Sequence, residues 1–233
     1  TTDGSDPSQT VGTIYTAPIP VSTNTTIRAI AYAAGYDPSI IMEAVYSFTI
    51  PISDIATLRA QVTGSGNIYS LTGEAVLTYQ NANRNTKYIQ DATAAIVIDD
   101  NSGNISTTYN LYDSITGITG YLNPYNGLLQ FVPVADPGAA TSSNNVVVPE
   151  VRTLASLTSA DQAKLIKVMG ATITHATMTQ FPSYATNMNV SDSSIPSLTL
   201  RTFPNTDYAG TDIPLEPVTL TCLVGQFNTS MQV

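Results

Sequence analysis

The chain has 233 residues, of which 42% are hydrophobic and only 11% charged, so it has enough apolar side chains for packed cores, which excludes a disordered chain. Eight Lys and Arg against seventeen Asp and Glu give a net charge of −9, which repels phosphate backbones and disfavours generic nucleic-acid binding. A single Cys and a single His exclude a disulfide framework and a His/Cys zinc cluster, and the apolar runs are too short for a transmembrane helix.

The first 51 residues predict a small β module. Residues 25–32 alternate apolar and polar side chains, and a second strand follows at residues 42–50 after a turn. With a period of two, that second strand carries on one face five apolar side chains that we expect to form a buried sheet face: Met42, Ala44, Tyr46, Phe48 and Ile50. The chain opens on a strand end (TTDGSDPS) and closes inside a predicted strand (NTSMQV), so we expect a piece of a longer protein whose secretory signal is absent or removed.

A short helix and five strand segments are predicted between residues 52 and 135. Ser53 and Asp54 offer N-cap oxygens to a helix that carries Ile55 and Leu58 on one side. A strand interrupted by Gly73 follows, then a hairpin, a loop or short helix, and a second hairpin. The strand segments are residues 68–79, 86–90, 94–99, 114–122 and 128–134.

The same plan is predicted a second time after a Ser-, Asn-, Pro- and Gly-rich linker at residues 135–149. A helix-like turn at residues 151–157 precedes a strand in which Gly170 takes the place of Gly73. The strand segments are residues 164–176, 187–191, 198–203, 218–224 and 230–233. The closing hairpins match most closely, with YNGLLQF at 125–131 against FNTSMQV at 227–233, which predicts an internal duplication.

The predicted fold class is therefore all-β. We expect a fibronectin III/Ig-like β-sandwich fragment at residues 1–51, followed by tandem OB-fold-like barrels at residues 52–135 and 146–233. A strand, a hairpin, a connecting segment and a second hairpin make the five-stranded plan of that barrel, and a glycine suits the bend of its first strand. One continuous ten-stranded β-sandwich is the competing architecture, and the repeat favours the barrels.

Two resemblances cover almost the whole chain. TTDGSDPS, IYTAPIPVS, TTIRAIAYAAGYDPS and AVYSFTI resemble the fibronectin III-like module at the end of chitobiase and β-hexosaminidase-type proteins. GEAVLTYQNANRNTKYIQDATAAIVIDD, ITGITGYLNPYNGLLQFVPVADPGA and VTLTCLVGQFNTSMQV resemble the OB-fold domains of secreted and surface proteins of Bacteroidetes. These resemblances imply export to the cell surface or periplasm, in a multi-domain parent, without a settled activity.

The two residues best suited to nucleophilic or acid–base chemistry are predicted to be structural. His175 shares strand parity with Ala171 and Ile173 near a strand end, and the sequence has no G-x-S-x-G elbow for a hydrolase triad. Cys222 has the parity of core residues and no basic neighbour in sequence, so we expect an inert core thiol.

Carboxylates give the remaining catalytic and metal hypotheses. Paired carboxylates at Asp91, Asp99 and Asp113 would suit glycoside hydrolysis, but each reads as a turn or strand-entry residue. The run at residues 99–104 (DDNSGN) has oxygen donors and a glycine, yet lacks the spacing of a calcium loop and fits a turn better. We therefore predict no catalytic residue, no metal and no cofactor.

The predicted binding surface follows from the barrel, because OB-folds bind ligands on strands two and three and the flanking loops. In the first copy this surface combines tyrosine rings with hydrogen-bonding side chains: Tyr79, Arg84, Lys87, Tyr88, Tyr125 and Asn126. Tyrosines that merely cover the barrel ends are an equally good interpretation. The corresponding stretch of the second copy, residues 178–191, has no Lys or Arg and is interpreted as structural.

The leading hypothesis is a non-enzymatic accessory region of an exported, cell-surface bacterial protein that contacts a polysaccharide or another surface protein. The alternative is an oligonucleotide-binding region of a secreted nuclease-type protein, which the charge balance disfavours. A hydrolase built on Asp91, Asp99 and Asp113 is the third reading. The sequence leaves the oligomeric state open.

Overall fold

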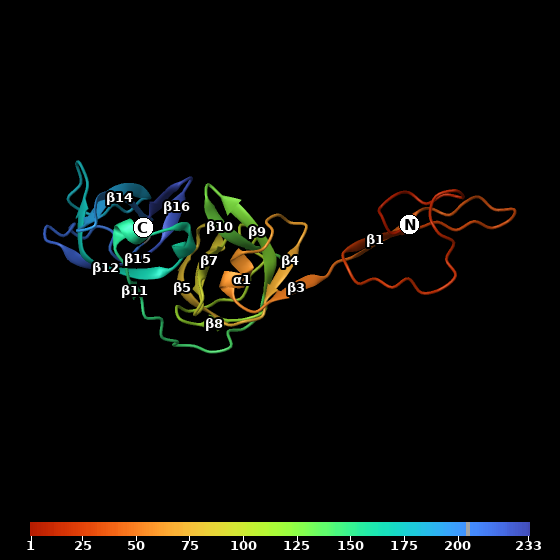
Figure 1. Cartoon of the computed structure of the whole chain (residues 1–233), viewed down its shortest axis with the longest axis horizontal. Coiled ribbons are helices and arrows are strands. Elements are labelled where there is room, and N and C mark those ends of the chain that lie inside the picture. The colour runs from red at the N-terminus through yellow and green to blue at the C-terminus, as the bar shows by residue number, and fades with distance from the viewer. Residues whose placement is uncertain (204–205) are drawn as a thin grey trace. The chain divides into compact units, whose positions relative to one another are not determined.

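The protein is described by a computed structural model that covers residues 1–203 and 206–233 (Figure 1). The chain forms two compact units, Thr1–Ile50 and Pro51–Val233. Strands hold 40% of the residues and helices 6%, in a small N-terminal sheet and two curled, half-barrel sheets, which confirms the predicted all-β class. Within the described residues, no helix has the length and hydrophobicity that crossing a bilayer requires.

The first unit contains one two-stranded antiparallel sheet. Strand β1 (Thr25–Ala29) pairs with β2 (Met42–Tyr46), so that Thr25 lies opposite Tyr46. The predicted second strand is broken after Tyr46, and its continuation is a separate strand, β3 (Thr49–Ile52). The predicted buried face is wrong, because every residue of β2 is exposed and Pro7 is the one buried residue of this unit. A sheet face becomes buried only when a second layer packs on it.

The first half-barrel begins with a short helix, α1 (Ile55–Arg59), which Asp54 caps as predicted by accepting a bond from the Thr57 N–H. Its sheet has the order β3-β4-β9-β10-β7-β6-β5-β8. The strands after β3 are β4 (Ile68–Leu71), β5 (Ala75–Asn81), β6 (Thr86–Gln90), β7 (Ala95–Ile98), β8 (Ser114–Ile115), β9 (Ile118–Tyr125) and β10 (Leu128–Pro133). A 3-10 turn, η1 (Asn83–Asn85), joins β5 to β6.

The sheet curls because the predicted first strand of the barrel, residues 68–79, divides into β4 and β5, which pair with different strands. Strand β4 pairs with β9, while β5 pairs with β6 near the other end of the sheet order, and only residues 72–74 separate β4 from β5. Gly73 lies at this break, where a Cβ would stand 2.0 Å from the Ser53 carbonyl oxygen. The predicted glycine bend is therefore present, and it lets the sheet enclose a core around Leu77, Ile96 and Phe131.

The second half-barrel repeats this arrangement. Its sheet has the order β11-β12-β13-β14-β17-β16, and β15 also pairs with β12. The strands are β11 (Glu150–Val151), β12 (Leu165–Thr174), β13 (Thr186–Asp192), β14 (Ile195–Thr202), β15 (Val218–Leu223), β16 (Gly225–Phe227) and β17 (Ser230–Gln232). The short 3-10 turns η2 (Leu154–Ser156) and η3 (Ser159–Asp161) stand where the first copy has α1. A separate core surrounds Ile166, Val190 and Val224.

The pairing registers support the duplication. In the first copy Gln130 of β10 lies beside Val97 of β7 in a parallel pair, and in the second Gln232 of β17 lies beside Thr199 of β14, also in parallel. Both residue numbers increase by the same offset, so the matched closing hairpins of the sequence occupy the same place in each sheet. The single ten-stranded sandwich is excluded, because the two copies form separate sheets with separate cores.

The predicted linker is not free of the first half-barrel. Thr141 and Ser142 bond to the backbone of Ser114 in β8, and Asn145 donates to the carbonyl of Tyr112. Asp136 accepts bonds from the N–H groups of residues 106 and 107, with Ser106 at 2.9 Å. The segment therefore packs along the barrel wall before the chain enters the second copy.

Candidate functional site

Two of the three tyrosines of the predicted surface form a pair on the outside of the first half-barrel. Strands β5 and β6 place Tyr79 directly opposite Tyr88, with ring centroids 5.6 Å apart and ring planes at 72°. The side-chain oxygen of Asn81 accepts the Asn83 N–H at 2.8 Å, and its side-chain nitrogen donates to the Tyr79 hydroxyl. The pair is thus held in a fixed edge-to-face geometry.

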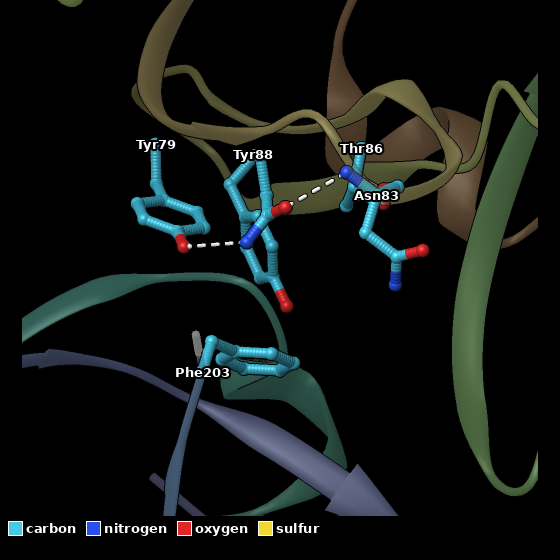
Figure 2. Close-up of a pocket in the computed structure, with 6 residues that line it drawn as sticks. Tyr79, Asn83, Thr86, Tyr88 and Phe203 are labelled. Carbon is cyan, nitrogen blue, oxygen red and sulfur yellow. Dashed lines mark hydrogen bonds between the residues drawn. The ribbon is translucent and has the colours of Figure 1, made fainter. Parts of the chain in front are cut away.

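The second half-barrel covers part of this surface. Tyr88 packs with Ala95 and Val97 of β7 and with Ala163, which precedes β12. Phe203, which directly follows β14, lines a crevice of about 40 Å³ together with Tyr79 and Tyr88 (Figure 2). Burial, with a smaller contribution from Tyr79, raises the pKa of Tyr88 to about 12. Tyr88 is therefore a contact between the two copies and not an open stacking platform.

Lys87 lies on the opposite side of the same strand. The residue is 3% exposed, and its Nζ donates to the backbone carbonyl and the Oδ1 of Asn85, at 3.2 and 2.7 Å. Burial lowers the pKa of its ammonium group. The expectation that Lys87 faces a surface ligand is wrong. The alternation of β6 already indicated this, because Lys87 lies on the same face of the strand as the core residue Ile89.

Arg84 is exposed and held by an ion pair. It lies in the β5–β6 turn with a left-handed backbone (φ 53°), and Asn85 after it is left-handed too (φ 45°). Its Nε and Nη2 donate to the two carboxylate oxygens of Asp99 at 2.7 and 2.5 Å. Half of the Arg84 side chain is exposed against 7% for Asp99, and this bidentate bond raises the pKa of Arg84.

A hollow of about 170 Å³ opens beside this ion pair. Its walls are Arg84, Thr86, Asp99, Tyr125 and Gln130. Tyr125, at the end of β9, is 64% exposed. Two residues of the predicted set, Arg84 and Tyr125, therefore meet in one place, together with Asp99 and Gln130, which the sequence reasoning did not assign to this surface.

Asn126 lies instead where the two copies contact each other, a region that we call the junction. It takes a left-handed conformation (φ 47°) in the β9–β10 turn, and its carbonyl accepts the Asn228 N–H at 2.5 Å. The next residue, Gly127, is left-handed as well, and a Cβ there would stand 2.0 Å from the Asn228 carbonyl oxygen. The matched turns of the two closing hairpins thus contact each other.

Gln162 is the central polar residue of this junction, and no local pattern indicated this role. It is 2% exposed, its Nε2 donates to Gly127 O and Gln226 Oε1 at 2.7 Å each, and its Oε1 accepts the Leu129 N–H at 3.1 Å. Arg59 of α1 adds a bond to the Ser159 carbonyl at 2.6 Å. These contacts join the two half-barrels through fully bonded polar groups.

The carboxylates considered for catalysis have structural partners. Asp91 accepts the Ile55 N–H at the start of α1 at 2.7 Å, and also closes its own turn through the Thr93 and Ala94 N–H groups. Asp113 accepts the Asn110 N–H at 2.8 Å. Each of these carboxylates, like Asp99, is engaged with a backbone or arginine donor.

The predicted turn at residues 99–104 is built around Asp100. Its oxygens accept the N–H groups of Asn104 and Ile105, both at 2.8 Å, and the Asn85 amide at 2.7 Å. Over the described residues, no group of three or more His, Cys, Asp or Glu side chains gathers in a metal-binding arrangement.

His175 and Cys222 lie apart, at two places in the second half-barrel. The Nδ1 of His175 accepts the N–H groups of Thr177 and Met178, both at 3.3 Å, which makes a turn just after β12. Cys222 packs against the second core, and burial raises the pKa of its thiol to about 12. The thiol is therefore protonated at neutral pH and weakly nucleophilic, as the sequence predicted.

Comparison with known proteins finds one family match, at the start of the chain. A model of the Fn3-associated family matches residues 1–46. A search of curated proteins finds no match to the chain. Because the family match covers far less than half of the chain, it describes the first unit and leaves the two half-barrel sheets without a family assignment.

Proposed function

We propose that the chain is a non-enzymatic accessory region of an exported, multi-domain bacterial protein, and that it binds a glycan or another surface component. The observation that carries the proposal is that the two ends of the outer face of the first half-barrel have different surroundings. One end of that face packs on the second half-barrel, while the other end leaves Arg84, Tyr125 and Gln130 open around a hollow.

Two further observations support this proposal. The Fn3-associated match at residues 1–46 agrees with the resemblance to the fibronectin III-like module of chitobiase-type proteins, which is an accessory module. The half-barrels have the strand plan of the OB-fold domains that they resemble in sequence, and those occur in secreted and surface proteins. These resemblances support the proposal of export and of a multi-domain parent.

The oligonucleotide-binding alternative has less support. Its stacking surface would need Tyr88 and its backbone clamp would need Lys87, yet the first packs between the half-barrels and the second is buried. The remaining cation, Arg84, is neutralised by Asp99 in a chain of net charge −9. Tight binding of a phosphate backbone requires several unpaired cations.

The test compares three activities of the purified chain. We expect retention on insoluble polysaccharides or bacterial cell-wall material, no turnover of a panel of chromogenic glycosides, and no binding of labelled single-stranded DNA near physiological salt. Turnover that disappears in Asp99→Asn would overturn the non-enzymatic proposal. Micromolar DNA binding that Tyr88→Ala abolishes would favour the oligonucleotide alternative.

A further inference from the structure

We propose that the hollow beside Arg84 is a binding site for one ring of a neutral saccharide; this assignment rests on the accessory function proposed above and names its ligand class. The hollow lies on the outer face of β6, β7 and β10, at the end that the second half-barrel leaves open. Val97 and Asp99 mark the border between the covered end and the open end, since they are two residues apart on the same face. Val97 packs toward the other half-barrel, while Asp99 lines the hollow.

The polar part of the site is fixed before any ligand arrives. The bidentate bond to Asp99 orients the Arg84 guanidinium, and the two consecutive left-handed residues define the turn that presents it. Arginine has five N–H donors, of which the bond to Asp99 uses two, and each carboxylate oxygen has a second lone pair. Donors and acceptors therefore lie side by side, which suits a hydroxyl group because it both donates and accepts.

Tyr125 supplies the apolar part. The residue is 64% exposed and lines the same hollow as the ion pair. A pyranose ring has a face of C–H groups and a rim of hydroxyl groups, so it can pack on the tyrosine while its rim bonds to Arg84, Asp99 and the Gln130 amide. Sites for small ligands commonly combine an apolar surface with a few fixed polar groups in this way.

Charge and size select the ligand class. Arg84 and Asp99 neutralise each other, and the chain carries a net charge of −9, so a phosphate, sulfate or uronate gains no net attraction. The volume of about 170 Å³ is below the roughly 300–1,000 Å³ typical of pockets for drug-sized ligands. The hollow therefore accommodates one sugar ring, with the rest of a chain outside.

The second half-barrel offers a matched control. The offset that relates Gln130 to Gln232 places Phe227 at the position of Tyr125 and Arg201 at the position of Asp99. Phe227 is 55% exposed, but Arg201 donates to the Asn187 amide oxygen at 2.9 Å, so the Arg–Asp pair is not rebuilt there. Phe227→Ala thus removes a similarly exposed ring from a place that lacks the Arg–Asp pair.

The experiment is affinity gel electrophoresis of the full chain with dextran, mannan, xyloglucan and polygalacturonate in the gel. We expect at least one neutral polysaccharide to retard the protein and polygalacturonate not to. Tyr125→Ala should weaken that retardation at least tenfold, Tyr125→Phe should keep it within threefold, and Phe227→Ala should leave it unchanged. Because Arg84→Gln leaves the buried Asp99 unpaired and lowers stability, Tyr125→Ala, which alters an exposed ring, is the decisive variant.

Three results would overturn the assignment. Retardation that Tyr125→Ala does not change refutes the site but leaves a glycan-binding accessory region in place. Retardation by polygalacturonate alone refutes the ligand class. No retardation by any of the four probes refutes the saccharide site, whereas the accessory function itself fails only through glycoside turnover or DNA binding in the test described above.

Discussion

At the scale of single residues, Gln162 has the largest predicted effect on stability. Its amide bonds to Gly127, Leu129 and Gln226, and it is almost fully buried between the two half-barrels. Gln162→Ala would remove the hydrogen-bond partner of part-buried groups on Gly127, Leu129 and Gln226. Because losing a buried hydrogen-bond partner costs about 1–3 kcal/mol, we expect a loss of about 2–4 kcal/mol in the free energy of unfolding. Urea unfolding measures this loss.

The control for Gln162 is Gln61→Ala, which removes one exposed hydrogen bond to the Thr57 carbonyl. Surface substitutions of this kind usually change the unfolding free energy by less than about 0.5 kcal/mol. If both substitutions had the same small effect, the junction would not depend on the Gln162 amide.

Asp136 makes stability depend on acid pH. Hydrogen bonds from the Ser106 hydroxyl, then from the Gly138 N–H and from Thr107, hold the pKa of its carboxyl well below the ordinary value. A carboxyl group whose pKa is lower in the folded than in the unfolded state stabilises the fold at a pH above its unfolded-state pKa. This stabilisation is lost as the pH falls from there through the folded-state pKa. We therefore expect the unfolding free energy to fall below about pH 4.

Asp136→Asn isolates this contribution. The variant should be less stable than the wild type at pH 7 and should lose less stability between pH 5 and pH 3, as measured by urea unfolding at each pH. Asp161 adds to the same trend in both proteins, because bonds from Arg152 and Thr158 outweigh the effect of its burial and lower its pKa. Identical pH profiles for variant and wild type would contradict the role of Asp136.

The candidate site was only partly predictable at this scale. Arg84 and Tyr125 were found because the barrel plan places their loops together, and Lys87 was misplaced although the alternation of β6 put it inside. Asp99 was grouped with the carboxylates Asp91 and Asp113 and not with Arg84, because Arg84 is fifteen residues away and their bond depends on a left-handed turn. Tyr88 packs on a second half-barrel whose position no local pattern encodes.

At the scale of elements, the two copies share a capping arrangement that is stronger evidence of duplication than the sequence match. Asp91 accepts the Ile55 N–H at 2.7 Å, and Asp192 accepts the Leu154 N–H at 2.8 Å. Hydroxyl groups from the same two turns accept the following N–H groups, from Thr93 in one copy and Ser194 in the other, both at 3.1 Å. In each copy, the turn of one hairpin thus caps the first helical turn.

We therefore expect Asp91→Ala and Asp192→Ala to have similar costs. Each removes a cap and opens an Asx turn, and loss of an N-cap side chain typically costs about 0.5–2 kcal/mol. Chemical denaturation should show losses within about 1 kcal/mol of each other. A large cost in one copy with none in the other would mean that the arrangement has a structural role in only one of them.

The β9–β10 turn provides a second prediction at this scale. Gly127 has φ +85° and approaches the Asn228 carbonyl so closely that a Cβ has no room. Gly127→Ala should therefore lower the melting temperature and loosen the junction, costing at least about 1–3 kcal/mol for the left-handed backbone. Gly66→Ala, which meets open space, should leave stability unchanged; equal effects of the two substitutions would contradict the close contact.

The elements themselves were the most predictable part of the fold. Periodicity and turn residues placed most strands of both copies, the Asp54 cap and the bend at Gly73, because each depends on neighbouring residues. The short strands β11 and β16 were not predicted. The β2 strand was predicted to bury Met42 and Tyr46, and they are exposed. Alternation indicates which residues share a face, but burial also requires a layer to pack on that face.

At the scale of the whole molecule, the two units differ in how they are stabilised. Residues 51–233 contain the hydrophobic clusters of the described chain, and the two half-barrels are joined by polar bonds and by the cluster at Ala95, Val97 and Ala163. The first unit buries Pro7 alone and exposes large apolar side chains such as Ile14 and Tyr36. Little apolar burial gives little protection against local opening.

Hydrogen exchange of the full chain tests this difference. We expect amides of β1 and β2 to exchange at least a hundredfold faster than those of β7 and β10, because opening a two-stranded sheet without a packed face costs little free energy. Mass spectrometry of peptic fragments measures both regions in one sample, and the buried strands of the second half-barrel serve as the internal control. Equal protection of β1 and β7 would mean that residues 1–50 gain their stability from contacts outside their own unit, and it would turn the search for an interaction surface toward Met42, Val45 and Tyr46.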